Sequence, residues 1–537
     1  MTASKMIRGT MILTVATFFA KFLGIFFVIP YNAMTGNEGT YLYTMSYTPY
    51  SIILSISTMG LPLAVSKFVS KYNALGDYDS GRRLFRTGIV LMSLTGLVGF
   101  MVVFFGSPWF VTLYNIPASN YANVVLVMRV CSIAILIVPV MSLMRGYFQG
   151  FQSMGPTAVS QVLEQVGRVG FILVSSFIII KVMNGSVVTA AVFATFAAFI
   201  GAVAGLYVML HYWVKRRPYI KKMEALQKDG QQRYKMRLGP MYKELISYAI
   251  PFVGVGIAMQ LYQLLDQVMA FHYLEYSKQI STVIVTDLTM NDQKMVMIPV
   301  TLATSLAVSA VPAIIVSYTK GDLRGVNHKI TEALQLVLFL TVPAAMGMSE
   351  LGYMVHGLLY NVAPGDHLEI GGSILTWYSP SAIFFSLFQV GASILQGINH
   401  QRVTLVALGV GVLAKVLTNP ISMKLFGMVG PIIATDLGYL ISLVIILVAV
   451  RKATDYRFSL ISSQFIHIIV YTAVMMLAIR LIFFFFGGAI PHSRWSALPV
   501  ITISVIVGAL IYLLLAKWTG LLRKIMGRTR SKAAKEN

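Results

Sequence analysis

A small set of charged side chains lies inside otherwise apolar stretches, and these residues are best placed to do chemistry. They are Lys21, Arg129, Glu164, Arg168, Asp266, Lys415 and Asp436. A charged side chain near the centre of a bilayer is costly unless it faces a partner or water. Cations outnumber anions in this set, and Lys and Arg neutralise phosphate oxygens strongly in a low dielectric. The set therefore favours a ligand that carries phosphate or pyrophosphate.

The spacing of these residues divides them into two groups. Glu164 and Arg168 are four residues apart, so both side chains lie on one face of a helix and are able to form a structural ion pair. Lys21 and Lys415 have no opposite charge within one helical turn. Each of these lysines needs a partner from another helix or a water-filled cavity, and we interpret both as cavity residues.

Arg129 and Asp266 complete the predicted cavity. Arg129 is equally well placed to extend its side chain to the membrane interface. Asp266 follows Gln260 and Gln263 by one to two helical turns, which adds polar groups to the same helix. A carboxylate at this place also leaves a proton- or sodium-coupled drug exporter open as an alternative.

The sequence contains no motif for a cofactor or for catalysis. It has neither a Gly-x-x-x-x-Gly-Lys-Ser/Thr loop nor a His-Glu-x-x-His helix. The single cysteine, Cys131, excludes a disulfide within the chain and a multi-cysteine metal site. The histidines are scattered without ligand spacing, and the segment 271–294, with Asp287 and Asp292, is predicted to be a loop. We therefore expect a transporter without a cofactor or metal, and not an enzyme.

Long apolar stretches must position these residues. The chain has 537 residues, of which 57% are hydrophobic and only 11% are charged, whereas a soluble protein carries about a quarter charged residues. Apolar runs of about 20 residues recur from one end to the other, and a helix of that length crosses a hydrocarbon core about 30 Å thick. The sequence predicts an all-α polytopic membrane protein with about fourteen transmembrane helices.

The two halves of the chain share a pattern of residues. Gln149-Gly150, Thr157 and Arg168 recur at the same separation as Gln396-Gly397, Thr404 and Lys415, and Leu61-Pro62 and Gly76-Asp77 recur as Val311-Pro312 and Gly321-Asp322. We interpret this as two six-helix lobes related by a parallel pseudo-twofold repeat, followed by two further helices. Pro62 and Pro312 would bend matching helices and act as hinges, unless they are simply tolerated, as proline often is in membrane helices.

The distribution of charge suggests where the lobes begin and end. We predict an N-terminal lobe 1–214, a basic cytoplasmic linker 215–243, a C-terminal lobe 244–455, an extra helix pair 456–520 and a basic tail 521–537. Most of the 42 Lys and Arg fall in segments that are cytoplasmic if the N-terminus is, and the predicted external loops 32–41, 111–121 and 359–372 contain none. This is the positive-inside bias, and an even number of spans returns the C-terminus to the cytoplasm. The net charge of +23 therefore predicts contact with membrane lipids and not with nucleic acid.

Two groups of motifs resemble a known family. Gly36-Asn37-Glu38-Gly39-Thr40-Tyr41 and Gly60-Leu61-Pro62-x-Ala64-x-Ser66-Lys67 are similar to the start of polysaccharide-transport proteins of the multidrug/oligosaccharidyl-lipid/polysaccharide (MOP) exporter superfamily. Arg145-Gly146-Tyr147-Phe148-Gln149-Gly150 and Gln161-x-x-Glu164-x-x-x-Arg168 resemble its Firmicute branch, which holds the stage V sporulation protein B relatives and the MurJ-type lipid II flippases. The likeness covers essentially the whole chain.

The resemblance implies a flippase in the bacterial plasma membrane. It would carry lipid II, the undecaprenyl-pyrophosphate-linked precursor, from the cytoplasmic to the outer leaflet for peptidoglycan synthesis, cell wall biogenesis and cell shape. It further implies a V-shaped pair of lobes that alternate access to a cationic cavity, and a groove for the lipid tail on the last two helices. Glu38, in the shared motif, is assigned to the gate together with Pro62 and Pro312.

Lys21 inherits one role from the resemblance. Lys21-Phe22-Leu23-Gly24 matches an Arg-x-Leu-Gly in the first helix of Gram-negative members, which implies contact with the pyrophosphate. The sequence then departs from that pattern, since a second first-helix arginine aligns with Phe27 and a second-helix arginine falls near Ser55. The phosphate site must therefore be rebuilt from other residues, or the substrate differs.

Other functions stay open at this point. The nearest is a flippase for another undecaprenyl-linked polysaccharide, such as a teichoic-acid or capsule repeat. A drug/cation antiporter is a further alternative. A cell-wall scaffold would instead recruit cell-wall synthesis proteins through the basic loop 214–243.

Overall fold

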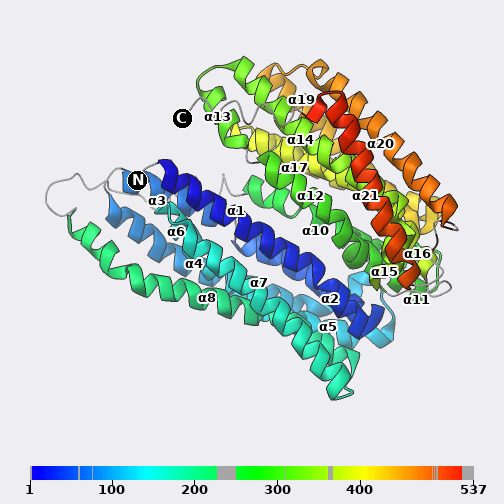
Figure 1. The fold of residues 1–537 in the computed structure, drawn as a ribbon. Coiled ribbons are helices and arrows are strands. Elements are labelled where there is room, and N and C mark those ends of the chain that lie inside the picture. The colour runs from blue at the N-terminus through cyan, green and yellow to red at the C-terminus, as the bar shows by residue number, and fades with distance from the viewer. Residues whose placement is uncertain are drawn as a thin grey trace. The chain divides into compact units, whose positions relative to one another are not determined.

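The computed structural model describes residues 3–58, 61–74, 77–226, 250–308, 310–360, 367–486 and 494–522, together with residues 488 and 490. Helices make up almost all of this part of the chain, and no strand occurs in it (Figure 1). The all-α prediction is therefore confirmed. The predicted linker and tail lie largely outside these ranges, except that residues 215–226 continue a long helix.

Eleven segments within the described ranges are long and apolar enough to cross a membrane. Several of them contain a break: for example, Val15–Thr58 is interrupted at Gly36, where φ is 65°, and Gln401–Thr454 contains the turn Gly427–Val429. Gly36 adopts this left-handed backbone because it has no side chain. A multi-pass membrane protein is confirmed, while the number of crossings stays a prediction.

The chain divides into two compact units, Met1–Val268 and Met269–Asn537. The main helices of the first unit are α1 (Ala3–Phe26), α2 (Val28–Thr58), α3 (Leu61–Ala74), α4 (Tyr78–Tyr114), α5 (Ala118–Ser132), α6 (Val138–Gly150), α7 (Met154–Phe177) and α8 (Val187–Leu226). Helix α10 (Ala258–Tyr273) begins in the first unit and ends in the second. The second unit continues with α11 (Lys278–Thr286), α12 (Asp292–Val308), α13 (Val311–Thr319), α14 (Leu323–Glu350), α15 (Gly352–Tyr360), α16 (Leu368–Tyr378), α17 (Ser381–Gly397), α18 (Gln401–Phe426), α19 (Gly430–Thr454), α20 (Ser459–Phe485) and α21 (Arg494–Trp518).

The residues of the sequence repeat have matching places in the two units. Asp77 caps the N-terminus of α4, where its carboxylate accepts from the Ser80 amide at 3.1 Å. Asp322 caps α14 in the same way, accepting from the Gly325 amide at 2.9 Å. Each aspartate satisfies an amide that a helix leaves unpaired at its start. Asp77 and Asp322 thus have the same local role in the two units, while the pseudo-twofold relation of the lobes stays a prediction.

The repeated prolines and glycines also correspond. Pro62 and Pro312 are each the second residue of a helix, α3 and α13, where proline fits the first turn. The sequence had suggested that these prolines bend the interior of a helix. In the structure each one lies at the start of a helix instead. Gly150 and Gly397 end α6 and α17, and a Cβ added to Gly150 would lie 2.6 Å from the Cβ of Val69. The Gln-Gly pair thus marks a close helix approach that a larger residue would prevent.

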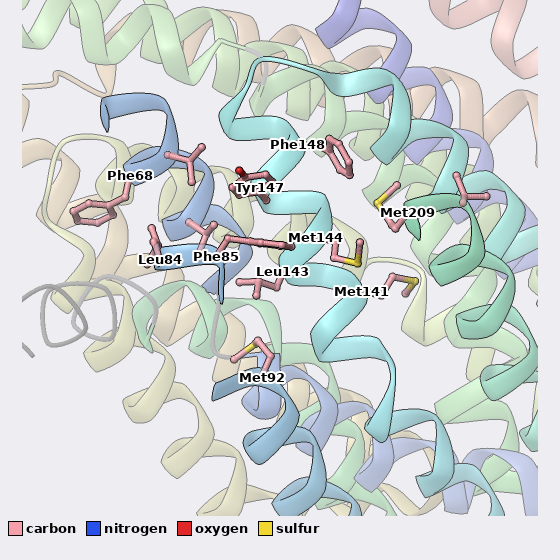
Figure 2. Close-up of a cluster of buried hydrophobic side chains, with 13 residues drawn as sticks. Phe68, Leu84, Phe85, Met92, Met141, Leu143, Met144, Tyr147, Phe148 and Met209 are labelled. Atoms are coloured by element: carbon pink, nitrogen blue, oxygen red, sulfur yellow. The ribbon is translucent and has the colours of Figure 1, made fainter. Parts of the chain in front are cut away.

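Helix α6 is the centre of a buried core in the first unit (Figure 2). The core joins α6 to α3, α4 and α8 through the labelled residues Met141, Leu143, Met144, Tyr147, Phe148, Phe68, Leu84, Phe85, Met92 and Met209. The ring centroids of Phe85 and Tyr147 are only 4.3 Å apart. Because α7 begins four residues after α6 ends, this core also fixes the start of α7.

The loop predicted over 271–294 is wrong for most of its length. Helix α11, the π-helical turn Asp287–Asn291 and the start of α12 follow one another without a break there. They belong to the apolar segment Lys278–Thr319. Asp287 and Asp292 are therefore buried helical residues, and their polarity had made the segment look like a loop.

Candidate functional site

Helices α1 and α7 pack against each other in the first unit. The Thr17 hydroxyl donates to Gln161 Oε1 at 2.9 Å, and a Cβ added to Gly24 would lie 2.9 Å from Gln165 Nε2. Thr17, Lys21 and Gly24 follow one another at helical spacing, so they share one face of α1. Lys21 therefore lies on the face of α1 that meets α7.

Lys21 has no partner in the described part of the chain. Its side chain is exposed, and it forms no ion pair or hydrogen bond with any residue in the described part of the chain. An uncompensated ammonium binds an anionic oxygen strongly where the dielectric is low. Lys21 is thus a candidate to contact an anionic ligand beside α7.

Arg168 lies on the Gln161–Gln165 side of α7, one turn further along. Its Nη2 donates to the Tyr43 hydroxyl at 2.8 Å, and its Nη1 donates to the Tyr47 hydroxyl at 3.2 Å. The guanidinium carbon is also 4.9 Å from the centre of the Tyr47 ring. Both partners are neutral, so they orient the guanidinium without cancelling its charge. The sequence had not indicated these two tyrosines.

An aromatic row accompanies this arginine on the first two helices. The ring centroids of Phe27 and Tyr43 are 5.8 Å apart, those of Tyr43 and Tyr47 are 5.4 Å apart, and those of Tyr47 and Tyr50 are 5.3 Å apart. Phe27 is buried. Phe27, which stands where the family pattern has a second arginine, is therefore part of this aromatic packing and offers no charge.

Glu164 does not pair with Arg168, and that expected pairing is wrong. Its Oε2 accepts from Arg145 Nη2 at 2.6 Å. Arg145 also donates to the Ser160 hydroxyl from Nη2 at 2.6 Å and from Nε at 3.1 Å. Ser160 in turn donates to the Gly205 carbonyl oxygen at 2.9 Å. This network joins α6, α7 and α8, and it leaves Arg168 free of a carboxylate partner in the described residues.

Arg129 ties two helices together. Its Nε donates to the Phe104 carbonyl oxygen and to the Ser107 hydroxyl, both at 3.2 Å. The guanidinium carbon lies 5.3 Å from the centre of the Phe104 ring. These contacts fasten α5 to α4, which points to a structural role rather than extension to the membrane interface.

The polar residues of α10 differ in burial. Asp266 is buried, whereas Gln260 and Gln263 are partly buried. The next residue, Gln267, is fully buried and donates through Nε2 to the Thr48 hydroxyl at 3.0 Å and to the Thr44 carbonyl oxygen at 3.4 Å. Gln267 thus attaches α10 to α2 within the first unit, a contact that sequence reasoning missed.

Lys415, the repeat partner of Arg168, has a different environment. It is fully buried, and its Nζ donates to the Pro431 carbonyl oxygen at 3.3 Å and also to the Thr435 hydroxyl. Both acceptors belong to α19, so Lys415 joins α18 to α19 in the second unit. Its interpretation as an open cavity residue does not fit this burial. Glu38, by contrast, is exposed two residues after the break at Gly36.

An apolar groove with a volume of about 420 Å³ lies in the second unit between α14, α20 and α21. Its lining includes Pro343, Gly347, Met475, Ile479, Gly508 and Tyr512. The Tyr512 hydroxyl donates to the Phe339 carbonyl oxygen at 3.0 Å, so the ring presents carbon to the groove. The groove therefore suits a hydrocarbon chain and not a polar group.

A buried acid–base cluster in the second unit was also missed. Asp287, Asp292 and His356 each have a potential ligand atom within 4.8 Å of the others. His356 is 64 residues from its partner Asp292, so no local spacing could reveal the pair. The contact between His356 Nδ1 and Asp292 Oδ1 is 2.7 Å, a hydrogen-bond distance.

Comparison with solved structures identifies the fold. The fold is similar to an inward-facing multidrug resistance transporter of the MATE family and MOP superfamily, with a TM-score of 0.65 and 12% identity over 79% of this chain and 94% of that one. It is equally similar to the lipid II flippase MurJ in an inward closed conformation, with a TM-score of 0.63 and 15% identity over 96% of this chain and 99% of that one. The chain therefore has the fold that these MOP superfamily transporters share.

The chain belongs to the polysaccharide biosynthesis protein family, whose model matches residues 6–317, and within it to the MurJ group. It is 39% identical to the lipid II flippase MurJ of Bacillus subtilis (strain 168) over 98% of this chain and 97% of that protein. It is 26% identical to the stage V sporulation protein B of the same organism over 62% of each chain. The resemblance inferred from the motifs is confirmed, and the chain is a multi-pass protein of the bacterial plasma membrane.

Proposed function

We propose that this chain translocates lipid II from the inner to the outer leaflet of the plasma membrane by alternating access. One observation carries the proposal: the chain is 39% identical to a lipid II flippase over 98% of its length. The ligand would be an undecaprenyl pyrophosphate that carries a glycopeptide. Its chemistry requires cations for the head and an apolar surface for the tail.

Lys21 and Arg168 would supply the cations for the pyrophosphate. Lys21 is exposed on the face of α1 that meets α7, and Arg168 is oriented by neutral tyrosines. Arg168 and Phe27 both contact Tyr43, the first by a 2.8 Å hydrogen bond and the second with ring centroids 5.8 Å apart. Arg168 thereby provides a cation next to the position where Phe27 replaces one. This contact supports Arg168 as the cation that takes the place of the missing arginine.

The groove between α14, α20 and α21 would hold part of the undecaprenyl tail. Lipid chains are as apolar as the groove, so burial away from water gives little driving force there. Shape decides instead, because the small residues Gly347 and Ala509 let a chain approach the helix backbones closely. A branched prenyl chain in this groove would hold the lipid near the transporter while the head changes leaflet.

Depletion in cells tests the function. In a strain without a redundant flippase, loss of the chain should leave lipid II inaccessible to a membrane-impermeant label at the outer surface. Unchanged labelling of lipid II at the outer surface would contradict the proposed function. If another undecaprenyl-linked glycan were trapped inside instead, the substrate assignment would be wrong and the transporter class would stand.

Substitution of Lys21 tests the site. Lys21→Ala should abolish complementation at normal membrane abundance, whereas Lys21→Arg should retain part of it, because a guanidinium also binds phosphate. Lys181→Ala is a matched control, since Lys181 is an exposed cation that follows α7 in the same unit. Equal activity of Lys21→Ala and Lys181→Ala would show that the cation on α1 is dispensable.

A bulky substitution tests the groove. Ala509 lines the groove and is exposed, so Ala509→Trp should fill it and slow translocation at least severalfold. The neighbouring residue Leu510 is exposed but does not line the groove, which makes Leu510→Trp the control. Equal transport by both variants would exclude the groove from the path of the lipid tail.

A further inference from the structure

Three acid–base side chains meet inside the second unit. Asp287 lies in the π-helical turn that precedes α12, Asp292 is the first residue of α12, and His356 is on α15. They are only 1%, 0% and 2% exposed. His356 Nδ1 and Asp292 Oδ1 are 2.7 Å apart. π-helical turns often mark functional sites, and here the turn brings two carboxylates to one histidine.

This cluster holds more acceptors than the surrounding groups can satisfy. Asn291 Nδ2 donates to Asp287 Oδ1 at 2.8 Å, and His356 donates to Asp292 Oδ1. Asp292 Oδ2 and Asn291 Oδ1 are buried and receive no hydrogen bond from any residue in the described ranges. Two carboxylates and one imidazolium leave a net charge of −1, which is costly in an apolar interior. One added proton removes that charge and supplies an O–H donor.

The distances favour a proton over a metal ion. Two atoms that bind one zinc ion at about 2.0–2.2 Å lie roughly 3.3 Å apart in a tetrahedral site. The 2.7 Å separation of His356 Nδ1 and Asp292 Oδ1 is too short for that arrangement and typical of a charged hydrogen bond. The ring is also confined, since a Cβ added to Gly371 of α16 would lie 2.1 Å from His356 Nε2. His356 therefore has little room to turn toward an ion.

Several charged or polar groups lie on the helices that pack around the cluster. On α15, the Tyr360 hydroxyl donates to the Asn291 carbonyl oxygen at 2.7 Å. On α12, Lys294 is two residues from Asp292 and so projects from another side of the helix. At the end of α14, Glu350 is paired with Arg480 of α20 at 2.8 Å. Helix α16 approaches through Gly371. The titratable groups that meet in this part of the described chain are thus Asp287, Asp292, His356 and Tyr360.

Helix α15 connects the cluster to the apolar groove. His356 and Tyr360 are four residues apart, so one face of α15 holds both Asp292 and the Asn291 carbonyl. The residue before His356, Val355, lines the groove, as does Leu351 just before the helix. A change in the hydrogen bonds of His356 therefore acts on a helix that forms one wall of the groove.

We propose that Asp287, Asp292 and His356 form a proton-binding site, and that this proton is the coupling ion of transport. The proton comes from water on one side of the membrane, resides on the carboxylates beside His356 and leaves to water on the other side. Only O–H and N–H bonds form and break. The coupling rests on the proposed function, whereas the binding of a proton by the cluster does not.

Purified full-length protein in liposomes that contain lipid II tests the coupling. A potassium ionophore with equal potassium on both sides holds the membrane potential at zero, and a pH difference of one unit is imposed. If one proton moves with each lipid, the ratio of lipid II in the two leaflets should shift toward about tenfold, because one pH unit is a tenfold proton ratio. Asp287→Asn and Asp292→Asn should keep the ratio near one. Glu369→Gln, an exposed acid on α16, should behave as wild type.

The outcomes separate the two proposals. If the wild type moves no lipid II even without a gradient, the proposed function fails. If it moves lipid II but the ratio stays at one under the gradient, or if Asp287→Asn keeps the wild-type ratio, the coupling fails. His356→Gln is a second variant in case an aspartate variant does not fold. It should also keep the ratio of lipid II in the two leaflets near one under the pH gradient. Stoichiometric zinc or manganese in the purified protein, with loss of transport on chelation, would overturn the proton assignment in favour of a metal ion.

Discussion

Replacement of Arg145 should destabilise the first unit without touching the ligand. The side chain is 12% exposed, and it bonds to Glu164 at 2.6 Å and to Ser160 at 2.6 and 3.1 Å. Arg145→Ala leaves the carboxylate of Glu164, which is 24% exposed, without its cation. Removing one partner of a buried ion pair lowers the free energy of unfolding by about 3–5 kcal/mol. The partial exposure of Glu164 places the expected loss near the lower end, about 3 kcal/mol.

The only cysteine provides the assay. Cys131 is fully buried in the first unit, so a dye that fluoresces on reaction with a thiol reports the unfolding of that unit. A loss of about 3 kcal/mol corresponds to a fall in Tm of roughly 6–12 °C for a unit of this size. The double variant Arg145→Met with Glu164→Met should recover most of the stability, because both charges are gone and Ser160 still donates to Gly205.

Arg168→Ala is the control variant for Arg145→Ala, because it removes an arginine from the same unit without removing an ion pair. Arg168 is bound to neutral tyrosines, so its loss strands no buried charge and should change the Tm by only a few degrees. It should nevertheless abolish translocation. If Arg145→Ala kept the wild-type Tm and lost transport instead, Arg145 would be a ligand-binding residue and the separation of roles would be refuted.

Three further outcomes follow from contacts elsewhere in the chain. Gly371→Ala forces a Cβ to 2.1 Å from the buried His356 ring and should lower the free energy of unfolding by about 2–3 kcal/mol, measured by intrinsic fluorescence on heating. Gly409→Ala, where an added Cβ meets nothing within 4 Å, should be neutral or raise the stability by up to about 1 kcal/mol; equal losses in both variants would contradict the steric argument. Gln267→Leu should lower the free energy of unfolding by about 1 kcal/mol, because the two hydrogen bonds from Gln267 to α2 are lost. An unchanged Tm would show that other contacts hold α10.

The sequence was sufficient to find the charges but not their partners. Any charged residue stands out in an apolar run, so Lys21, Arg168 and Lys415 were visible without a structure. Partners depend on how helices pack, and the carboxylate of Glu164 is paired with Arg145, 19 residues away, rather than with the arginine one turn along. The fold class was predictable for a different reason. Hydropathy and the repeat are properties of long segments, and single contacts do not alter them.

The two repeat-related cations show how the units have diverged. Arg168 and Lys415 occupy the same place in the sequence repeat, yet one is bound to tyrosine hydroxyls and the other is fully buried against the backbone of α19. The cation at this place is therefore held by tyrosine hydroxyls in the first unit and enclosed between two helices in the second. The second unit contains instead an apolar groove and a buried acid–base cluster, joined through α15. A symmetric pair of cation sites would suit a ligand that is charged at both ends. The asymmetry supports the proposed function, because a lipid with a charged head and an apolar tail would need a cation for one part and an apolar groove for the other.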